Sequence, residues 1–368
     1  MALYIFQFGL LQPLASVAGS QLVVVGFTLV LLIVMVANNR FRLKTYVYHA
    51  FILITVYVLM CTLANSSSIS LVLSSYLEFL AKGFSGFIFG SLDVDSSTLF
   101  NAFFKVAIVN FTILVFKPLG LMSGVNYMRF GYAMVPSAIM FWYGVFRFDK
   151  FRLLSWFLAL FTTGLTIIYG SRGALVVLML FFSLTITKSD AVSKQVKVLL
   201  VISCLAVIFL FLEQSLLLRL LDFLNYSLGI RAYALSKFRM MIVQGIAESS
   251  SGRDVLYGIL WESFLKSPVL GNGIFYSSIT YGFTPHNIFI QILVESGIIG
   301  LLFWLLIWFY GNRRYMMIAK EDRHLFEIAS LIISLAFGRL LFSSDMWLRP
   351  EYWFALSMLL AYPNKKVY

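Results

Sequence analysis

The chain has 368 residues, of which 61% are hydrophobic and only 12% are charged. A soluble domain carries about 25% charged residues and 45–50% apolar ones, so this composition excludes an ordinary soluble enzyme and an intrinsically disordered chain. The formal net charge is +12, but the basic residues fall between apolar runs and do not gather in one polar region, which argues against nucleic-acid binding. We therefore interpret the chain as an all-α polytopic membrane protein.

Apolar runs long enough to cross a bilayer recur along the whole chain. A membrane-spanning helix needs about 20 mostly apolar residues. Windows of that size predict about twelve spans, at residues 3–18, 20–37, 45–64, 69–90, 98–117, 128–147, 153–170, 173–187, 196–212, 286–310, 325–343 and 350–363. The fourth segment contains Glu78 and Lys82, which also suits an interfacial or re-entrant segment.

The basic residues predict which side of the membrane each loop faces. Lys and Arg gather in segments 38–44, 147–152, 188–197 and 311–324 and in the tail, whereas the short outer loops carry only Lys117, Arg129, Arg172 and Arg349. The positive-inside rule then places both termini in the cytoplasm. We expect no cleaved signal peptide, because no Lys or Arg precedes Arg40.

One long segment interrupts the series of short loops. The chain is expected to divide into N-terminal spans (1–212), a large outer loop (213–285) and C-terminal spans (286–368). Residues 215–224 are short and apolar and suit a helix on the membrane surface. Residues 249–268 predict a capped helix, with serines before it and Pro268 to end it.

Two arginines in or beside this outer region are candidate anion ligands. Arg172 lies in the tight turn "YGSRGALVV" between two apolar runs, and Arg253 lies near the start of the helix predicted over 249–268. The planar guanidinium can bind two phosphate oxygens at once, and a helix start favours an anion. Each arginine could equally be an interfacial or solvated residue at a helix end.

His286 is the candidate catalytic residue. It follows a proline and, with Asn287, begins a long apolar helix in "TPHNIFIQILVESGIIGLLFWLL". Because histidine ordinarily titrates near pH 6.5, neutral imidazole is available as a general base, although an interfacial polar role is also open. Asn287 could orient a substrate or cap the helix. Gly297 and Gly300 are interpreted as glycines that let another helix pack closely.

Two further charged positions could line the same site. Glu295 lies in the apolar helix, where a carboxylate is costly and needs a partner or a cavity. It is expected either to pair with Lys82, Lys105 or Arg339 or to line the site. Arg349 lies in "SSDMWLRPEYW" (343–353), which could also be an ion-paired interfacial loop with tryptophan anchors.

The sequence gives no support for a metal or a nucleotide cofactor. The two cysteines and three histidines are far apart, whereas a metal site needs clustered ligands. Asp93 and Asp95 are the only paired aspartates of the DxD kind, and we place them in a solvated turn on the inner side. We find no phosphate-binding Walker loop, so ATP-driven transport has no support.

Three segments together resemble the O-antigen ligase/polymerase superfamily of integral membrane glycosyltransferases. They are "GSRGALVV", "SSGRDVLYGILWESFLKSPVLGNGIF" and "PHNIFIQILVESGIIGLL". The last fits the family spacing of His-Asn, nine residues, Gly, two residues and Gly. A Thr-Gly extension often seen in ligases is absent, because Leu301 and Leu302 follow. The resemblance covers about residues 165–310.

The resemblance implies a bundle of the GT-C type and a reaction on the periplasmic face of the bacterial inner membrane. The donor would be an undecaprenyl-pyrophosphate-linked glycan and the acceptor a glycan hydroxyl, with no metal or other cofactor. It implies Arg172 and Arg253 as pyrophosphate ligands and a chain-length regulator and a flippase as partners. Membrane lipid would surround the chain, and no nucleic acid would bind.

Three functions remain open at this point. A polymerase would join lipid-linked repeat units, and the missing Thr-Gly extension favours it. A ligase would move the finished glycan to lipid A–core or to a protein. A flippase is less favoured, because no inverted repeat is visible and the polar residues concentrate in one outer loop.

Overall fold

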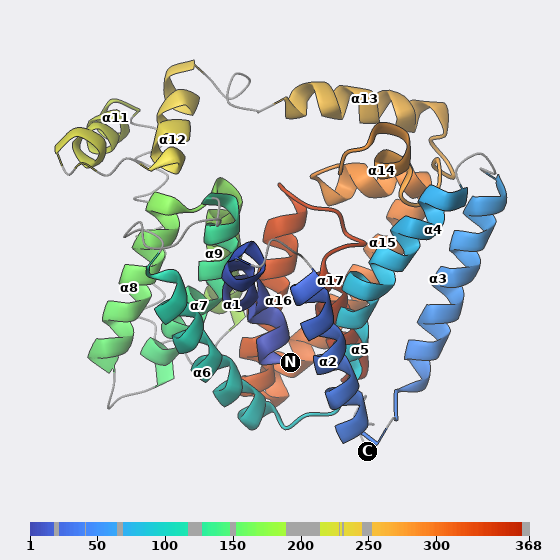
Figure 1. The fold of residues 1–368 in the computed structure, drawn as a ribbon, viewed down its shortest axis with the longest axis horizontal. Helices are drawn as coiled ribbons and strands as arrows, with labels where there is room; N and C mark the ends of the chain where they lie inside the picture. Colours follow the sequence, from blue (N-terminus) through green and yellow to red (C-terminus); the bar gives the residue numbers. More distant parts are fainter. Residues whose placement is uncertain are drawn as a thin grey trace. The chain divides into compact units, whose positions relative to one another are not determined.

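The computed structural model describes residues 1–17, 22–40, 42–64, 69–116, 127–147, 152–188, 214–227, 229, 232–244 and 252–362. All regular secondary structure in these ranges is helical (Figure 1). Each predicted span that falls in these ranges coincides with a helix, usually within a few residues at either end. The span predicted at 196–212 lies outside the described residues, as do several basic residues of the predicted inner loops.

The helices of the N-terminal half follow one another with short connections. They are α1 (Ala2–Val17), α2 (Leu22–Asn38), α3 (Thr45–Ala64), α4 (Ile69–Phe79), the π-turn η2 (Leu80–Phe84), α5 (Ser85–Ser91), α6 (Ser96–Leu114), α7 (Tyr127–Arg147), α8 (Arg152–Tyr169) and α9 (Arg172–Lys188).

The helices of the C-terminal half include several short ones. They are α11 (Gln214–Asp222), the π-turn η3 (Phe223–Ser227), α12 (Tyr233–Gln244), α13 (Arg253–Lys266), α14 (Tyr276–Tyr281), α15 (Ile288–Glu321), α16 (Arg323–Leu340) and α17 (Pro350–Ala361).

Several of these helices have the length and composition of membrane spans. Four described segments are long and apolar enough to cross a bilayer: Ile69–Ser91, Ser96–Leu114, Arg152–Tyr169 and Ile288–Glu321. Large apolar side chains on α2 and α3 are exposed, such as Ile33 at 63% and Leu53 at 70%. Exposed apolar surface of this extent is typical of a membrane protein. The count of twelve spans and the membrane sidedness stay predictions.

The chain forms two compact units that alternate along the sequence. The first unit comprises Met1–Ile5, Ser20–Ala102 and Val255–Tyr368, and the second comprises Phe6–Gly19 and Phe103–Asp254. The division into 1–212, 213–285 and 286–368 concerns membrane topology and stays a prediction.

Glycines allow the closest packing in the first unit. A Cβ at Gly83, Gly86 or Gly90 would overlap a backbone carbonyl of the segment Trp347–Phe354. Helix α5 and the π-turn before it therefore lie directly against α17 and the loop that precedes it. Buried aromatic side chains surround this contact, and the rings of Phe79 and Trp347 meet edge to face at 5.5 Å.

The second unit contains the turn that carries Arg172. Helices α8 and α9 are joined by Gly170 and Ser171, and this turn packs against α7. A Cβ at Gly131 of α7 would lie 2.9 Å from the Cα of Gly170, closer than ordinary packing permits. A Cβ at Gly173 would overlap the hydroxyl of Tyr132. The glycines beside Arg172 thus serve close contact with α7.

The large segment 213–285 is mostly helical where it is described. Helix α11 covers most of the surface helix predicted at 215–224, and Leu216 and Leu220 on it are exposed. Helix α13 confirms the helix predicted within 249–268, because it ends at Lys266, shortly before Pro268. The serines expected to precede it lie outside the described residues.

Candidate functional site

His286 stands at the start of α15, in the segment that joins it to α14. Its backbone is left-handed, with φ at 56°, a conformation that is uncommon for any residue except glycine. The imidazole is half-buried, and its nitrogens lie 3.3 and 3.4 Å from the hydroxyl of Thr284. Residues in this conformation often stand at functional sites, but the catalytic role of His286 stays a prediction.

Asn287 caps the helix that follows. Its side-chain oxygen accepts hydrogen bonds from the backbone N–H groups of Phe289 and Ile290, at 3.0 and 3.2 Å. The capping role expected for Asn287 is therefore confirmed. The alternative role, in which Asn287 orients a substrate, stays a prediction.

Helices α13 and α14 hold this segment in place. Leu260 and Phe264 of α13 pack with Val294 of α15 in one buried cluster. The hydroxyl of Tyr281 lies 2.7 Å from that of Ser263, and its ring stacks on Phe283 at 5.5 Å. The chain is thus anchored three residues before His286. The contacts of α13 with this segment come from its residues beyond Asp254, which belong to the first unit.

Helix α15 breaks at Gly297, and the loop that follows α13 fills the break. Gly297 has φ 64° and ψ −162°, a region that essentially only glycine adopts. The N–H of Ile298 donates to the carbonyl of Pro268, and the N–H groups of Asn272 and Gly273 donate to the carbonyls of Val294 and Glu295, each at 2.9 Å. The loop thereby satisfies backbone groups that the interrupted helix leaves without partners.

This arrangement corrects our interpretation of Gly297 and Gly300. They were expected to admit another helix, but a Cβ at Gly297 would overlap the carbonyl oxygen of Val269, which lies in a loop. A Cβ at Gly300 would meet only the side chain of Ser296, within the same helix. A loop makes this close approach because its backbone N–H and C=O groups are free to form hydrogen bonds. They pair with the backbone groups that the broken helix leaves without partners.

Replacing Gly297 with alanine should lower the free energy of unfolding by about 1–3 kcal/mol, since the backbone region is nearly forbidden to alanine. The thermal unfolding of the full chain in detergent measures this effect. Gly258→Ala on α13 is the matched control, because a Cβ there meets nothing within 4 Å. Equal midpoints for the Gly297→Ala variant and the native chain would contradict the role of the break.

Glu295 is buried, with 2% of its surface exposed, and its partners differ from those expected. The indole N–H of Trp347 donates to Oε2 at 2.6 Å, and the amide of Gln291 donates to Oε1 at 3.1 Å. The expected pairing with Lys82, Lys105 or Arg339 is not found among the described residues, and the alternative that Glu295 lines the site stays a prediction. Lys82 pairs with Glu78 at 2.5 Å, and Arg339 pairs with Glu351 at 2.6 Å. Glu295 instead joins α15 to the loop between α16 and α17.

Residues 344–347 of that loop are buried, whereas Phe342 is exposed. The segment 343–353 is ion-paired as expected, because Glu351 pairs with Arg339 at 2.6 Å. Its tryptophans, however, are buried inside the protein and do not lie on its surface. Burial raises the pKa of Asp345 above its ordinary value, and hydrogen bonds from Gln291 and Trp347 and the charge of Arg349 offset only part of this increase. Arg349 is half-buried at the start of α17. Its positive charge favours the ionised form of the buried Asp345.

The two candidate anion ligands both stand at helix starts in the second unit. Arg172 is the first residue of α9, and the backbone turn before it is tightly packed. The preceding Ser171 is buried, and its hydroxyl has no hydrogen-bond partner among the described residues. Arg253 is the first residue of α13 and is half-buried. His286, Asn287, Glu295 and Arg349 belong to the first unit.

Asp93 and Asp95 have structural partners. The carboxylate of Asp95 accepts hydrogen bonds from the hydroxyl of Ser97 and the N–H of Thr98, and these bonds lower its pKa to about 2. Asp93 pairs with Lys44 at 2.7 Å. Within the described ranges, no group of three His, Cys, Asp or Glu residues could hold a metal ion.

Sequence reasoning missed two residues of the buried polar network. Gln291 is fully buried and accepts a hydrogen bond from the N–H of Met346 at 2.9 Å. Its position four residues before Glu295 on the same helix face was a usable signal. Trp347 had no local signal, because its contact with Glu295 spans 52 residues of sequence.

Part of the chain matches a known protein family. Residues 156–305 match the family described as O-antigen ligase. This stretch is similar to an O-antigen ligase domain. The match confirms the resemblance to the O-antigen ligase/polymerase superfamily. No curated protein and no solved structure gives a significant match to the chain.

The O-antigen ligase domain includes nearly all the candidate site residues. It begins within α8 and ends within α15, so it contains Arg172, Arg253, His286, Asn287 and Glu295. Arg349 lies outside it, although the loop before Arg349 contacts Glu295 through Trp347. The apolar helices and the domain together point to a membrane protein with O-antigen ligase- or polymerase-like function.

Proposed function

We propose that the protein is a polymerase that joins polyprenyl-pyrophosphate-linked repeat units into O-antigen or a related surface polysaccharide. The transfer takes place on the periplasmic face of the bacterial inner membrane. The observation that carries the proposal is the O-antigen ligase domain over 156–305, which contains both arginines and the histidine that the chemistry needs.

Each residue has a defined role in this proposal. A hydroxyl oxygen of the acceptor glycan attacks the anomeric carbon of the donor, and the bond from that carbon to the pyrophosphate oxygen breaks. His286 takes the hydroxyl proton on an imidazole nitrogen as the new bond forms. Arg172 and Arg253 stabilise the negative charge that develops on the leaving pyrophosphate. The binding site of the acceptor glycan is lined or supported by Asn287, Glu295 and Arg349.

The family description favours a second candidate, an O-antigen ligase that transfers the glycan to lipid A–core. Purified protein in liposomes distinguishes the two when it is supplied with lipid-linked repeat units from the bacterium that encodes it. A polymerase yields a ladder of longer lipid-linked glycans from these units without further acceptor. Product that forms only after lipid A–core is added would assign the ligase function, and no product in either case would contradict both.

The segment 213–285 should lie on the periplasmic side. Leu270 is the suitable position for a cysteine probe, because its side chain is 72% exposed. In a variant without native cysteines, Leu270→Cys should react with a membrane-impermeant thiol reagent in intact spheroplasts. Arg313→Cys, in a predicted inner segment, should react only after lysis. The reverse pattern would contradict the predicted topology.

A further inference from the structure

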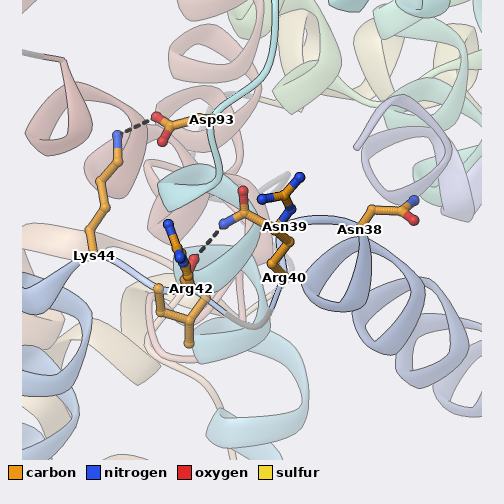
Figure 2. Close-up of a pocket in the computed structure, with 7 residues that line it drawn as sticks. Asn38, Asn39, Arg40, Arg42, Lys44 and Asp93 are labelled. Atoms are coloured by element: carbon orange, nitrogen blue, oxygen red, sulfur yellow. Dashed lines mark hydrogen bonds and ion pairs between the residues drawn. The ribbon is translucent and has the colours of Figure 1, made fainter.

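A basic pocket is present at the turn between α2 and α3. It has a volume of about 360 Å³ and is lined by Asn38, Asn39, Arg40, Arg42, Leu43, Lys44 and Asp93 (Figure 2). All of these residues belong to the first unit. The turn lies at the end of α3 away from α13 and α14, so the pocket is separate from the segment that carries His286 (Figure 1).

Positive charge exceeds negative charge in this pocket. Lys44 pairs with Asp93 at 2.7 Å, and the Asp93 side chain is 78% exposed. Neither Arg40 nor Arg42 has an acidic partner among the described residues. Two exposed guanidinium groups are therefore available to a ligand. A phosphate group is the natural complement, since guanidinium can donate two parallel hydrogen bonds to its oxygens.

The backbone of the turn is held in a defined conformation. Arg40 is left-handed, with φ at 53°. Its N–H donates to the carbonyl of Ala37 at 2.8 Å, and the N–H of Arg42 donates to the carbonyl of Asn39 at 3.1 Å. The Asn39 side chain also donates to the carbonyl of Arg42, as Figure 2 shows. A strained residue that several hydrogen bonds keep in place is typical of a binding site.

The apolar surfaces beside the turn indicate where the phosphate comes from. Val34 on α2 is 49% exposed, and Tyr48 and Ile52 on α3 are 51% and 55% exposed. A phosphate in the pocket would thus lie where the polar turn gives way to apolar helix surface, as the headgroup of a phospholipid does. Its acyl chains would cover that surface, whereas a free phosphate would leave it bare.

We propose that this turn binds the phosphate of an anionic phospholipid headgroup through Arg40 and Arg42. Basic pockets at the ends of membrane helices suit anionic headgroups, and each Lys or Arg near the surface increases the affinity about fivefold. The proposal is independent of the glycosyl-transfer function.

The test is a lipid titration of the full chain in detergent micelles. The midpoint of thermal unfolding is followed as phosphatidylglycerol or phosphatidylcholine is added, because a ligand of the folded state raises it. We expect phosphatidylglycerol to raise the midpoint more than phosphatidylcholine does. In the Arg40→Gln/Arg42→Gln variant the apparent Kd for phosphatidylglycerol should increase by about 30-fold.

Matched variants make each outcome decisive. Arg313→Gln/Lys320→Gln removes two exposed cations from α15 and should keep the native preference for phosphatidylglycerol. Asp93→Asn removes the one carboxylate of the pocket and should strengthen binding. An unchanged Kd in Arg40→Gln/Arg42→Gln would overturn the proposal, as would equal weakening by both double variants. Stabilisation of equal size by inorganic phosphate would assign the pocket to a free anion and overturn the lipid as its source.

Discussion

Replacing His286 with alanine should lower the rate of glycosyl transfer by about 10²–10⁴-fold, the range that a positioned general base contributes. The variant should fold, because Asn287 caps α15 and the cluster around Leu260 and Val294 anchors the segment independently of the imidazole. The measurement is product formation by purified protein in liposomes at saturating donor.

His49→Ala is the matched control for this variant. His49 is an exposed histidine on α3, and its loss should leave the rate unchanged. A rate for His286→Ala within twofold of the native rate would remove His286 from the reaction.

The pH dependence of the transfer rate shows whether His286 acts as a general base or as a positive charge that balances the pyrophosphate. A base must be neutral, so the rate should rise with pH as the imidazole loses its proton and then level off. His286→Arg and His286→Lys should be as inactive as the alanine variant, because neither cation accepts a proton at neutral pH. If His286→Arg kept most of the activity, the residue would act through its positive charge.

Removal of either candidate pyrophosphate ligand should lower the rate of glycosyl transfer nearly as much as His286→Ala does. Arg172→Ala and Arg253→Ala are each expected to lower the rate by about 10²-fold or more, since each removes a donor to charge that develops in the transition state. Lysine at either position should also be poor, because it cannot make the bidentate contact. The assay is again polymer formation at matched protein levels.

Arg239→Ala is the control for these arginines. Arg239 lies on α12 in an exposed ion pair with Asp222 at 3.1 Å, a contact that contributes little. If Arg172 and Arg253 bind the same pyrophosphate, the double variant should lose less than the product of the single losses. Losses that multiply fully would indicate that the two arginines act on separate groups.

Local features of this protein could be predicted from sequence because their causes are local. Apolar runs of the right length correspond to helices throughout the described ranges, and Pro268 correctly marked the end of α13. Asn287 caps α15 because a short polar side chain at that position reaches the N–H groups two and three residues on. The segments that suggested an O-antigen ligase family were also continuous stretches, and the family match confirms them.

Only the tertiary structure decided how these pieces meet. Glu295 was expected beside a lysine or arginine but lies against Trp347, and the segment around Asp345 was expected at an interface but is buried. Gly297 admits a loop where a helix was expected. In each case the deciding partner is more than 20 residues away in sequence. Helical periodicity and capping are set by neighbours within four residues, whereas which buried groups share hydrogen bonds is set by the packing of the whole unit.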